Sequence, residues 1–189
     1  MLRFAVVGHV EWVDFLPVPH VPRPGEIVQA SKSWAEAAGG GAVAAVQLAK
    51  LGGVATFFTA LGNDDHARHA EAQLASQGVD VHAAVRDCPQ RRAVAFLDSA
   101  GERTIATLGE RLVPVADDDL PWDVLAAMDG VYFTGGDGGA LRAARAARTL
   151  VATPRGSSAF PRSDETLDAL VRSARDVGEP EPMCPWSST

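Results

Sequence analysis

The stretch AAGGGAVAAVQLAKLGG, residues 37–53, decides how this chain is expected to fold. Three consecutive glycines, Gly39 to Gly41, lead into a run of small and aliphatic residues that two further glycines end. A glycine run that opens a helix lets main-chain N–H groups approach a ligand, because no side chain stands between them. The small side chains of residues 42–51 predict a helix that packs closely on a sheet. The alternative is a flexible linker, and the flanking sequence has to decide between the two.

The composition indicates one globular domain that acts on small molecules. The chain has 189 residues, of which 47% are hydrophobic and 22% charged, as in ordinary compact domains. Its net charge of −7 argues against a broad attraction to nucleic acid or to an anionic membrane. No apolar run approaches the roughly 20 residues of a membrane span, and acidic residues come too early for a signal peptide, so we expect a cytoplasmic protein. Cys88 and Cys184 give neither a disulfide framework nor zinc-ligand spacing.

Segments on both sides of the glycine run alternate between buried strands and helices. Residues 4–8 (FAVVG) and 54–62 (VATFFTALG) are short apolar runs that predict buried strands. Residues 63–77 begin with helix-capping side chains and predict a helix. Residues 116–154 then continue as helix, strand, helix, strand. This alternation predicts a parallel, doubly wound sheet.

Two segments interrupt the alternation and are predicted to form flaps. The first is a proline-rich loop over residues 18–26, followed by a half-exposed strand over residues 26–37. The second is a hairpin over residues 91–109, in which Gly101 takes the left-handed turn position. The last residues, 177–189 (VGEPEPMCPWSST), show no periodicity and carry three prolines. We interpret this end as irregular, from a frameshifted or prematurely ended reading frame.

The order of these glycines resembles the N-terminal pattern of the ribokinase-like (PfkB) carbohydrate kinases. The matching positions are Ala38, Gly39, Gly40, Gly41, Ala45, Gly52 and Gly62. Residues 8–26 (GHVEWVDFLPVPHVPRPGE) are similar to the family's first strand with its substrate aspartate and its Pro-Gly-Glu turn. LGNDD at 61–65 is similar to its Gly-Asp-Asp turn, and GERTI at 101–105 to its lid hairpin. The resemblance covers roughly residues 3 to 179 and rests on several ordered motifs.

The resemblance implies a fold and the residue range that adopts it. Members of the family are Rossmann-like three-layer α/β/α sandwiches with a small β lid over the substrate. We therefore expect residues 1–178 to form an incomplete, C-terminally truncated domain of this kind, with lid strands near 10–36 and 91–109. Residues 179–189 are expected to be an irregular tail. The resemblance also suggests a homodimer that pairs through lid strands.

The resemblance implies ATP-dependent phosphoryl transfer to a hydroxyl of a sugar or nucleoside, with ATP and Mg²⁺ as cofactors. It makes Asp14 an acceptor for substrate hydroxyls and places the backbone of Gly39, Gly40 and Gly41 against the substrate ring, which fits the properties of these residue types. Val43 stands where the family has a substrate-binding asparagine. Because valine cannot bond a hydroxyl, we expect a changed substrate.

The nucleotide side of the family pattern is less complete in this chain. Ser173 and Asp176, in SARD, stand where the family carries an Asn-x-x-Glu motif near the phosphates and Mg²⁺. The family's Gly-Ala-Gly-Asp motif, with its catalytic base, belongs beyond residue 189. We therefore assign no catalytic residue and no metal ligand, and expect little or no turnover from these residues alone. Asp137, after the glycines of TGGDGG, is interpreted as a helix cap and not as a replacement base.

Several other interpretations remain open. The chain can be a non-catalytic sugar-binding protein, or an interrupted gene product of low stability. Residues 39–44 also satisfy G-x-G-x-x-A with Asp64 downstream, the fingerprint of a dinucleotide-binding oxidoreductase. That fingerprint must directly follow a buried strand, and the residues before Gly39 are half polar. His66 and His69 beside Asp64 are interpreted as a solvated helix face, since no third metal ligand is evident.

Overall fold

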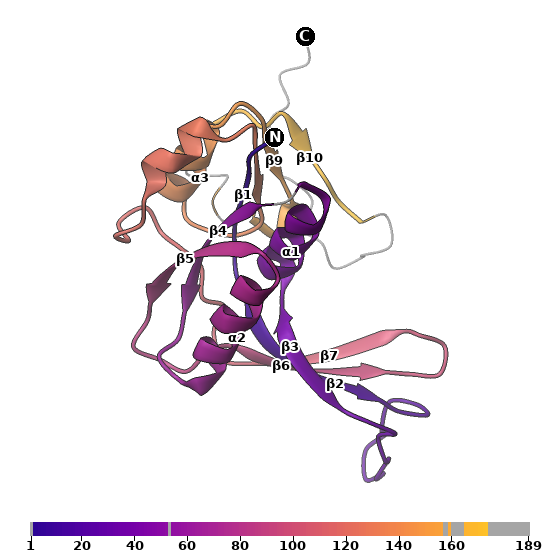
Figure 1. Cartoon of the computed structure of the whole chain (residues 1–189). Helices are drawn as coiled ribbons and strands as arrows, with labels where there is room; N and C mark the ends of the chain where they lie inside the picture. The colour runs from indigo at the N-terminus through magenta and orange to yellow at the C-terminus, as the bar shows by residue number, and fades with distance from the viewer. Residues whose placement is uncertain (1, 53, 157–158, 160–164, 174–189) are drawn as a thin grey trace.

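The protein is built on two β-sheets, seen in a computed structural model that describes residues 2–52, 54–156, 159 and 165–173. The larger sheet contains β1 (Phe4–Val7), β4 (Ala55–Leu61), β5 (Val79–Val85), β8 (Gly130–Phe133), β9 (Leu150–Ala152) and β10 (Ala169–Leu170). The smaller sheet contains β2 (Glu11–Pro17), β3 (Trp34–Ala38), β6 (Arg92–Leu97) and β7 (Arg103–Leu108). The helices are α1 (Gly40–Gly52), α2 (Asp65–Ser76) and α3 (Gly138–Arg145), with a 3₁₀ helix η1 (Trp122–Ala127). The smaller sheet projects away from the body as a lid (Figure 1).

The larger sheet is the middle layer of a three-layer sandwich. Among the described strands, its order is β10-β9-β8-β1-β4-β5, and each neighbouring pair runs parallel. Every residue of β4 is buried because both faces of this strand are covered. Phe57 packs into the core beneath α1 and α2, whereas its neighbour Phe58 packs into the core with η1 and α3. Successive side chains of a strand point to opposite faces, so this pair links both cores. The predicted α/β fold class is confirmed.

Small residues let α1 lie close to the sheet. Its buried face consists of Gly41, Ala42, Ala45, Val46 and Ala49. Alanine and glycine at these positions bring the helix backbone near the strands, as the sequence predicts. The helix begins at Gly40, directly after the lid strand β3. The flexible-linker alternative for residues 37–53 is therefore wrong.

Capping side chains set the starts of the next two helices. The carboxylate of Asp64 accepts from the N–H of Ala67 at 3.1 Å at the start of α2. Asp137 accepts from the N–H of Ala140 at 2.8 Å at the start of α3 and also from the N–H of Ala116. These bonds satisfy N–H groups that have no partner inside the helix. The interpretation of Asp137 as a helix cap is confirmed.

The lid is a thin sheet with a small core. Strand β2 lies between β3, to which it is antiparallel, and β6, to which it is parallel. Val13, Ala93 and Ala95 form its buried cluster. The predicted hairpin of β6 and β7 is confirmed, and Gly101 has φ +81° in its turn. Every residue of β7 is exposed, so this strand forms an open edge.

Two predicted elements are shorter than the sequence suggests. A strand was expected over residues 26–37, but β3 begins only at Trp34, and Ile27 before it is 98% exposed. A helix was expected within residues 116–128, but the structure has only η1 there. The side chain of Asp118 accepts from the N–H of Val115 at 2.8 Å and so favours a turn over a helix. The described helices include none long and apolar enough to cross a membrane. The predicted irregular end, residues 177–189, lies outside the described residues.

Candidate functional site

The connectivity of the larger sheet makes the carboxyl ends of β1 and β8 a topological switch point, and we call the region outside these ends the crevice. From β1 the chain moves outward through β4 and β5 on one side, and β8, β9 and β10 extend the sheet on the other. In open α/β sheets, ligands bind outside the carboxyl ends of the strands at such a switch point. Gly8 and His9 follow β1, and Thr134 follows β8. A Cβ on Gly8 would overlap the Thr134 side chain, so the two strand ends lie close together.

The three glycines hold the start of α1 against these strand ends. Gly39 has φ +88°, and a Cβ there would lie 3.2 Å from the His9 ring. A Cβ on Gly40 would lie 2.9 Å from Oγ1 of Thr134. A Cβ on Gly41 would lie 2.8 Å from both the His9 carbonyl oxygen and the Phe57 ring. Atoms of the protein itself therefore lie closest to this glycine run. Of the three glycines, Gly40 is the exposed one.

Two carboxylates of β2 lie at different distances from the glycines. Glu11 pairs with Ala38, the residue before Gly39, whereas Asp14 pairs with Ala35. Three residues along a strand correspond to roughly 10 Å. Because side chains alternate, Glu11 and Asp14 also leave opposite faces of β2. The structure thus brings Glu11, and not the predicted Asp14, to the glycine run.

The two carboxylates have different charged partners. Oε1 of Glu11 accepts from Nε of Arg91 at 2.6 Å, and both side chains are largely buried. Oδ2 of Asp14 accepts from Nη2 of Arg92 at 3.0 Å, where the side chains are 34% and 40% exposed. An exposed pair of this kind contributes little to stability. Asp14 is held on the lid, and Glu11 belongs to the crevice.

His9 lies at the bottom of the crevice as a neutral imidazole. The residue is 3% exposed, and its Nδ1 has no hydrogen-bond partner among the described residues. Its Nε2 lies 3.6 Å from Oε1 of Glu11. Burial, and then the positive charges of Arg111, Arg91 and Arg155, lower the pKa of His9 from 6.5 to about 3. Three arginines therefore act on one buried ring at the proposed site.

This lowered pKa predicts a loss of stability in mild acid. Below pH 6.5 the unfolded chain binds a proton on His9 that the folded chain rejects, so stability falls as the pH drops from 6.5 toward 3. The slope is about 1.4 kcal/mol per pH unit, so that His9 accounts for about 2 kcal/mol between pH 6.5 and 5. We expect urea unfolding to show this extra loss in the natural protein relative to His9→Gln. If the free energy of unfolding fell equally with pH in both proteins, the lowered pKa of His9 would be contradicted.

The other residues proposed from the sequence lie outside this cluster. Val43 is 50% exposed on the first turn of α1. Ser173 is exposed, and its predicted companion Asp176 lies outside the described residues. Within the described ranges, no group of three His, Cys, Asp or Glu side chains could hold a metal ion. The rings of His66 and His69 lie beside Trp12, at 6.5 and 5.8 Å between centroids.

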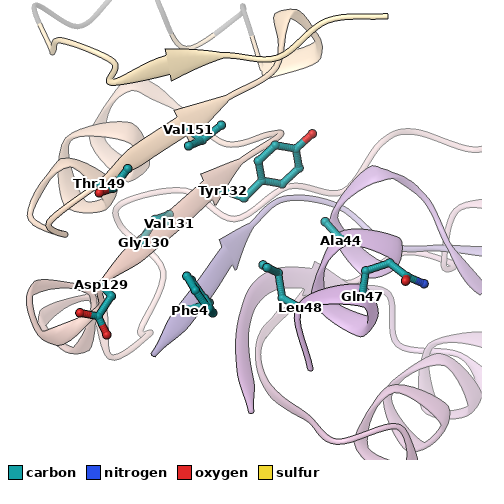
Figure 2. A pocket seen from close by; sticks show the side chains of 10 residues that line it. All are labelled: Phe4, Ala44, Gln47, Leu48, Asp129, Gly130, Val131, Tyr132, Thr149 and Val151. Atoms are coloured by element: carbon teal, nitrogen blue, oxygen red, sulfur yellow. The ribbon is translucent and has the colours of Figure 1, made fainter. Parts of the chain in front are cut away.

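A hollow lies at the opposite end of the strands. It has a volume of about 470 Å³ and lies beside α1, near the amino ends of β1 and β8 (Figure 2). Its lining consists of Phe4, Ala44, Gln47, Leu48, Asp129, Gly130, Val131, Tyr132, Thr149 and Val151. Most of these side chains are apolar, and ligands of such sheets bind at the carboxyl ends instead. We therefore place the candidate site at His9 and Glu11.

The sequence contained weak signals for the residues that were missed. Three residues separate Glu11 from the end of the first buried strand, a usual position for binding groups in such folds. Arg91 directly precedes the hairpin, and Arg111 closely follows it. Nothing in the sequence indicates that these segments meet, because 80 residues separate Glu11 from Arg91. Only the pairing of β2 with β6 brings them together.

Comparison with known proteins shows the family and the fold of this chain. The family model described as "pfkB family carbohydrate kinase" matches residues 1–155. No curated protein matches the sequence. Solved structures with the same fold include ribokinases from three organisms, each less than 25% identical to this chain.

The individual matches are as follows. The Thermotoga maritima ribokinase is 22% identical with a TM-score of 0.66, over 90% of this chain and 59% of that one. The Cryptococcus neoformans ribokinase, in complex with ADP, is 24% identical with a TM-score of 0.60, over 80% and 49%. The Arabidopsis thaliana ribokinase, complexed with ribose and ATP, is 23% identical with a TM-score of 0.60, over 82% and 55%. The chain thus spans between about half and three fifths of these proteins.

Proposed function

This chain belongs to the pfkB family of carbohydrate kinases, and on that premise we propose that its crevice binds a sugar or nucleoside for ATP-dependent phosphoryl transfer to a hydroxyl. One observation carries the proposal. The glycine run with its exposed Gly40, the buried His9 and the carboxylate of Glu11 lie together at the carboxyl ends of β1 and β8. A carboxylate is a strong acceptor for hydroxyl groups, and the exposed backbone of Gly40 allows a ligand to approach closely.

The proposed substrate wall contains the backbone of Gly39, Gly40 and Gly41 together with one acidic side chain. Glu11 is favoured for that acid, since it is the β2 carboxylate nearest the glycines. Asp14 stays a second candidate, because a lid that closes over a substrate could bring it inward. Val43 would replace a polar contact by an apolar one at the helix start.

For the phosphoryl donor we propose ATP with Mg²⁺. Support comes from the family and from two structural neighbours, one complexed with ADP and one with ribose and ATP. Ser173 and Asp176 remain the proposed contacts on this side, although only Ser173 is described. The described residues supply no ligand set for Mg²⁺, so no step is assigned to the metal.

The proposed location and assembly follow from the composition and from the lid. The composition fits a cytoplasmic protein, and the open edge of β7 offers a strand for pairing two copies through their lids. A non-catalytic sugar-binding protein would use the same crevice. The dinucleotide alternative has lost support, because the glycine run follows β3, an antiparallel strand of the lid.

The test is a calorimetric titration with sugars and nucleosides, both neutral and acidic, on the natural protein, Glu11→Gln and Asp14→Asn. For the ligand that binds best, we expect Glu11→Gln to weaken affinity roughly tenfold or more, because a charge-assisted hydrogen bond is lost. Asp14→Asn is expected to change it less than threefold. Glu71→Gln, at an exposed position of α2, is the matched control.

The outcomes separate the candidates. If Asp14→Asn weakened the affinity more than Glu11→Gln, the substrate contact would be assigned to Asp14. The lid would then have to close over the substrate. Binding that survives in both variants, or no binding of any compound, would contradict the proposed site.

A further inference from the structure

The lid has two different faces, and their contacts identify which of them belongs to the crevice. On one face the ring of Trp12 lies beside His66 and His69 of α2, at 6.5 and 5.8 Å between centroids. On the other face Oε1 of Glu11 lies 3.6 Å from Nε2 of His9. Side chains alternate along a strand, so every second residue of β2 from Glu11 onward shares its face. We call this side, which carries residues 11, 13 and 15 of β2, the crevice face.

An aromatic pair lies on the crevice face. Phe15 follows Glu11 by four residues in β2, and its cross-strand neighbour in β3 is Trp34. The two rings are stacked, with 5.2 Å between their centroids and 8° between their planes. Trp34 is 38% exposed and Phe15 is half-buried. Nζ of Lys32 lies 5.2 Å from the centroid of the Trp34 ring, but Lys32 is exposed and its long side chain can move aside.

The other two lid strands continue this apolar row across the crevice face. Phe15 is paired with Ala95 of β6, and Ala95 with Ile105 of β7. Residues that lie directly opposite each other in a sheet share a face. Ala95 is buried, and Ile105 is 51% exposed. The crevice face is therefore apolar from β3 to β7 in this row, whereas its row nearest the body contains the carboxylate of Glu11.

We infer that the site selects a nucleoside over a free sugar, and that the base of the nucleoside contacts Phe15 and Trp34. The inference rests on the function proposed above and names its substrate class. Four residues along β2 correspond to roughly 13 Å, which leaves room for a sugar joined to a flat base. Glu11 would bind the hydroxyl groups, and the aromatic pair offers ring surface for stacking a base. A free sugar would leave this apolar surface in water.

The experiment titrates ribose, adenosine, uridine and ATP separately into the natural protein and its variants by calorimetry. We expect at least one nucleoside to bind roughly tenfold or more tightly than ribose, because a base gains affinity by stacking on an aromatic side chain. Trp34→Ala should remove most of this preference, and the conservative variant Trp34→Phe should keep it. The affinity for ribose should change by less than about threefold in both variants, because ribose does not reach the aromatic pair.

Strand β7 provides a matched pair of substitutions that separates ligand contact from stability. Ile105 and Leu108 are 51% and 49% exposed, and their spacing of three residues puts them on opposite faces of the lid. Ile105→Ala should weaken nucleoside binding by roughly threefold, because apolar surface on the crevice face is lost. Leu108→Ala should leave that affinity unchanged. The melting temperature of the free protein should change by similar amounts in the two variants.

The contrary results distinguish this inference from the proposed function. If neither nucleoside bound more tightly than ribose, the inference would be rejected and the proposed sugar kinase function would stand. A preference that survives in Trp34→Ala, or equal losses in Ile105→Ala and Leu108→Ala, would also reject it. If Trp34→Ala weakened ATP and left the nucleosides unchanged, the aromatic pair would belong to the phosphoryl donor instead. If no sugar and no nucleoside binds, both proposals fail.

Discussion

Gly62→Ala is expected to lower the free energy of unfolding by about 3 kcal/mol, because its Cβ has no space. It would lie 2.6 Å from the carbonyl oxygen of Cys88 and 2.7 Å from the carbonyl carbon of Pro89, and closer still to the N of Gln90. These atoms are backbone and cannot swing aside. Gly62 is buried, and its N–H donates to Oε1 of Gln90 at 2.9 Å. Urea unfolding followed by circular dichroism measures the change.

The matched control is Gly101→Ala. Gly101 has φ +81°, and nothing lies within 4 Å of its added Cβ. Only backbone strain of about 1 kcal/mol opposes this change. A loss at Gly62 no larger than that at Gly101 would show that residues 88–90 can shift. Because Arg91 follows this segment, such a shift would also move the candidate site.

Phe57→Ala should cost about 3 to 5 kcal/mol, the usual range for a buried aromatic residue. The Phe57 ring is fully buried in the core beneath α1 and α2, and it lies directly under Gly41. Its removal leaves a cavity under the start of α1. The melting temperature should fall by roughly 6 to 20 °C, at about 2 to 4 °C per kcal/mol for a chain of this size. Calorimetry should detect this change readily.

Phe15→Ala provides the comparison for that prediction. Phe15 is only half-buried on the lid, where it stacks on Trp34 with 5.2 Å between ring centroids. It should lose about 1 kcal/mol, because the lid core is small and part of the ring already meets water. If the two substitutions lowered the stability equally, the core beneath α1 would have to rearrange and fill the cavity left by Phe57.

Most of the larger sheet could be predicted from the sequence, because its signals are local. Apolar runs such as residues 4–8 and 54–62 end at glycine or at capping side chains, and each gave a strand close to its predicted place. The extent of β3 could not be predicted, because residues 27–33 have strand-like composition but belong to neither sheet. The helix expected at residues 116–128 is mostly absent, because Asp118 accepts hydrogen bonds from the backbone N–H of Val115 in a turn and from Arg86, which lies 32 residues away in the sequence.

The site was harder to predict than the fold, because it depends on which face a strand presents. Glu11 and Asp14 are both acids of one strand, and composition cannot tell which lies nearer Gly39. An odd spacing of three residues puts them on opposite faces. Arg111 and Arg155 carry no local signal at all, since the fold alone brings their segments to His9.

Four chain segments among the described residues connect the lid to the body, and three of them lie close to His9. Gly8 to Val10 lead into β2, Gly39 leads out of β3, and residues 86–91 lead into β6. The fourth starts at Gly109, which Arg91 ties to Glu11. The two sheets are therefore joined in one small region, which is also the candidate site. We expect that a tilt of the lid would change the shape of this site, so that ligand binding and the angle of the lid would be coupled.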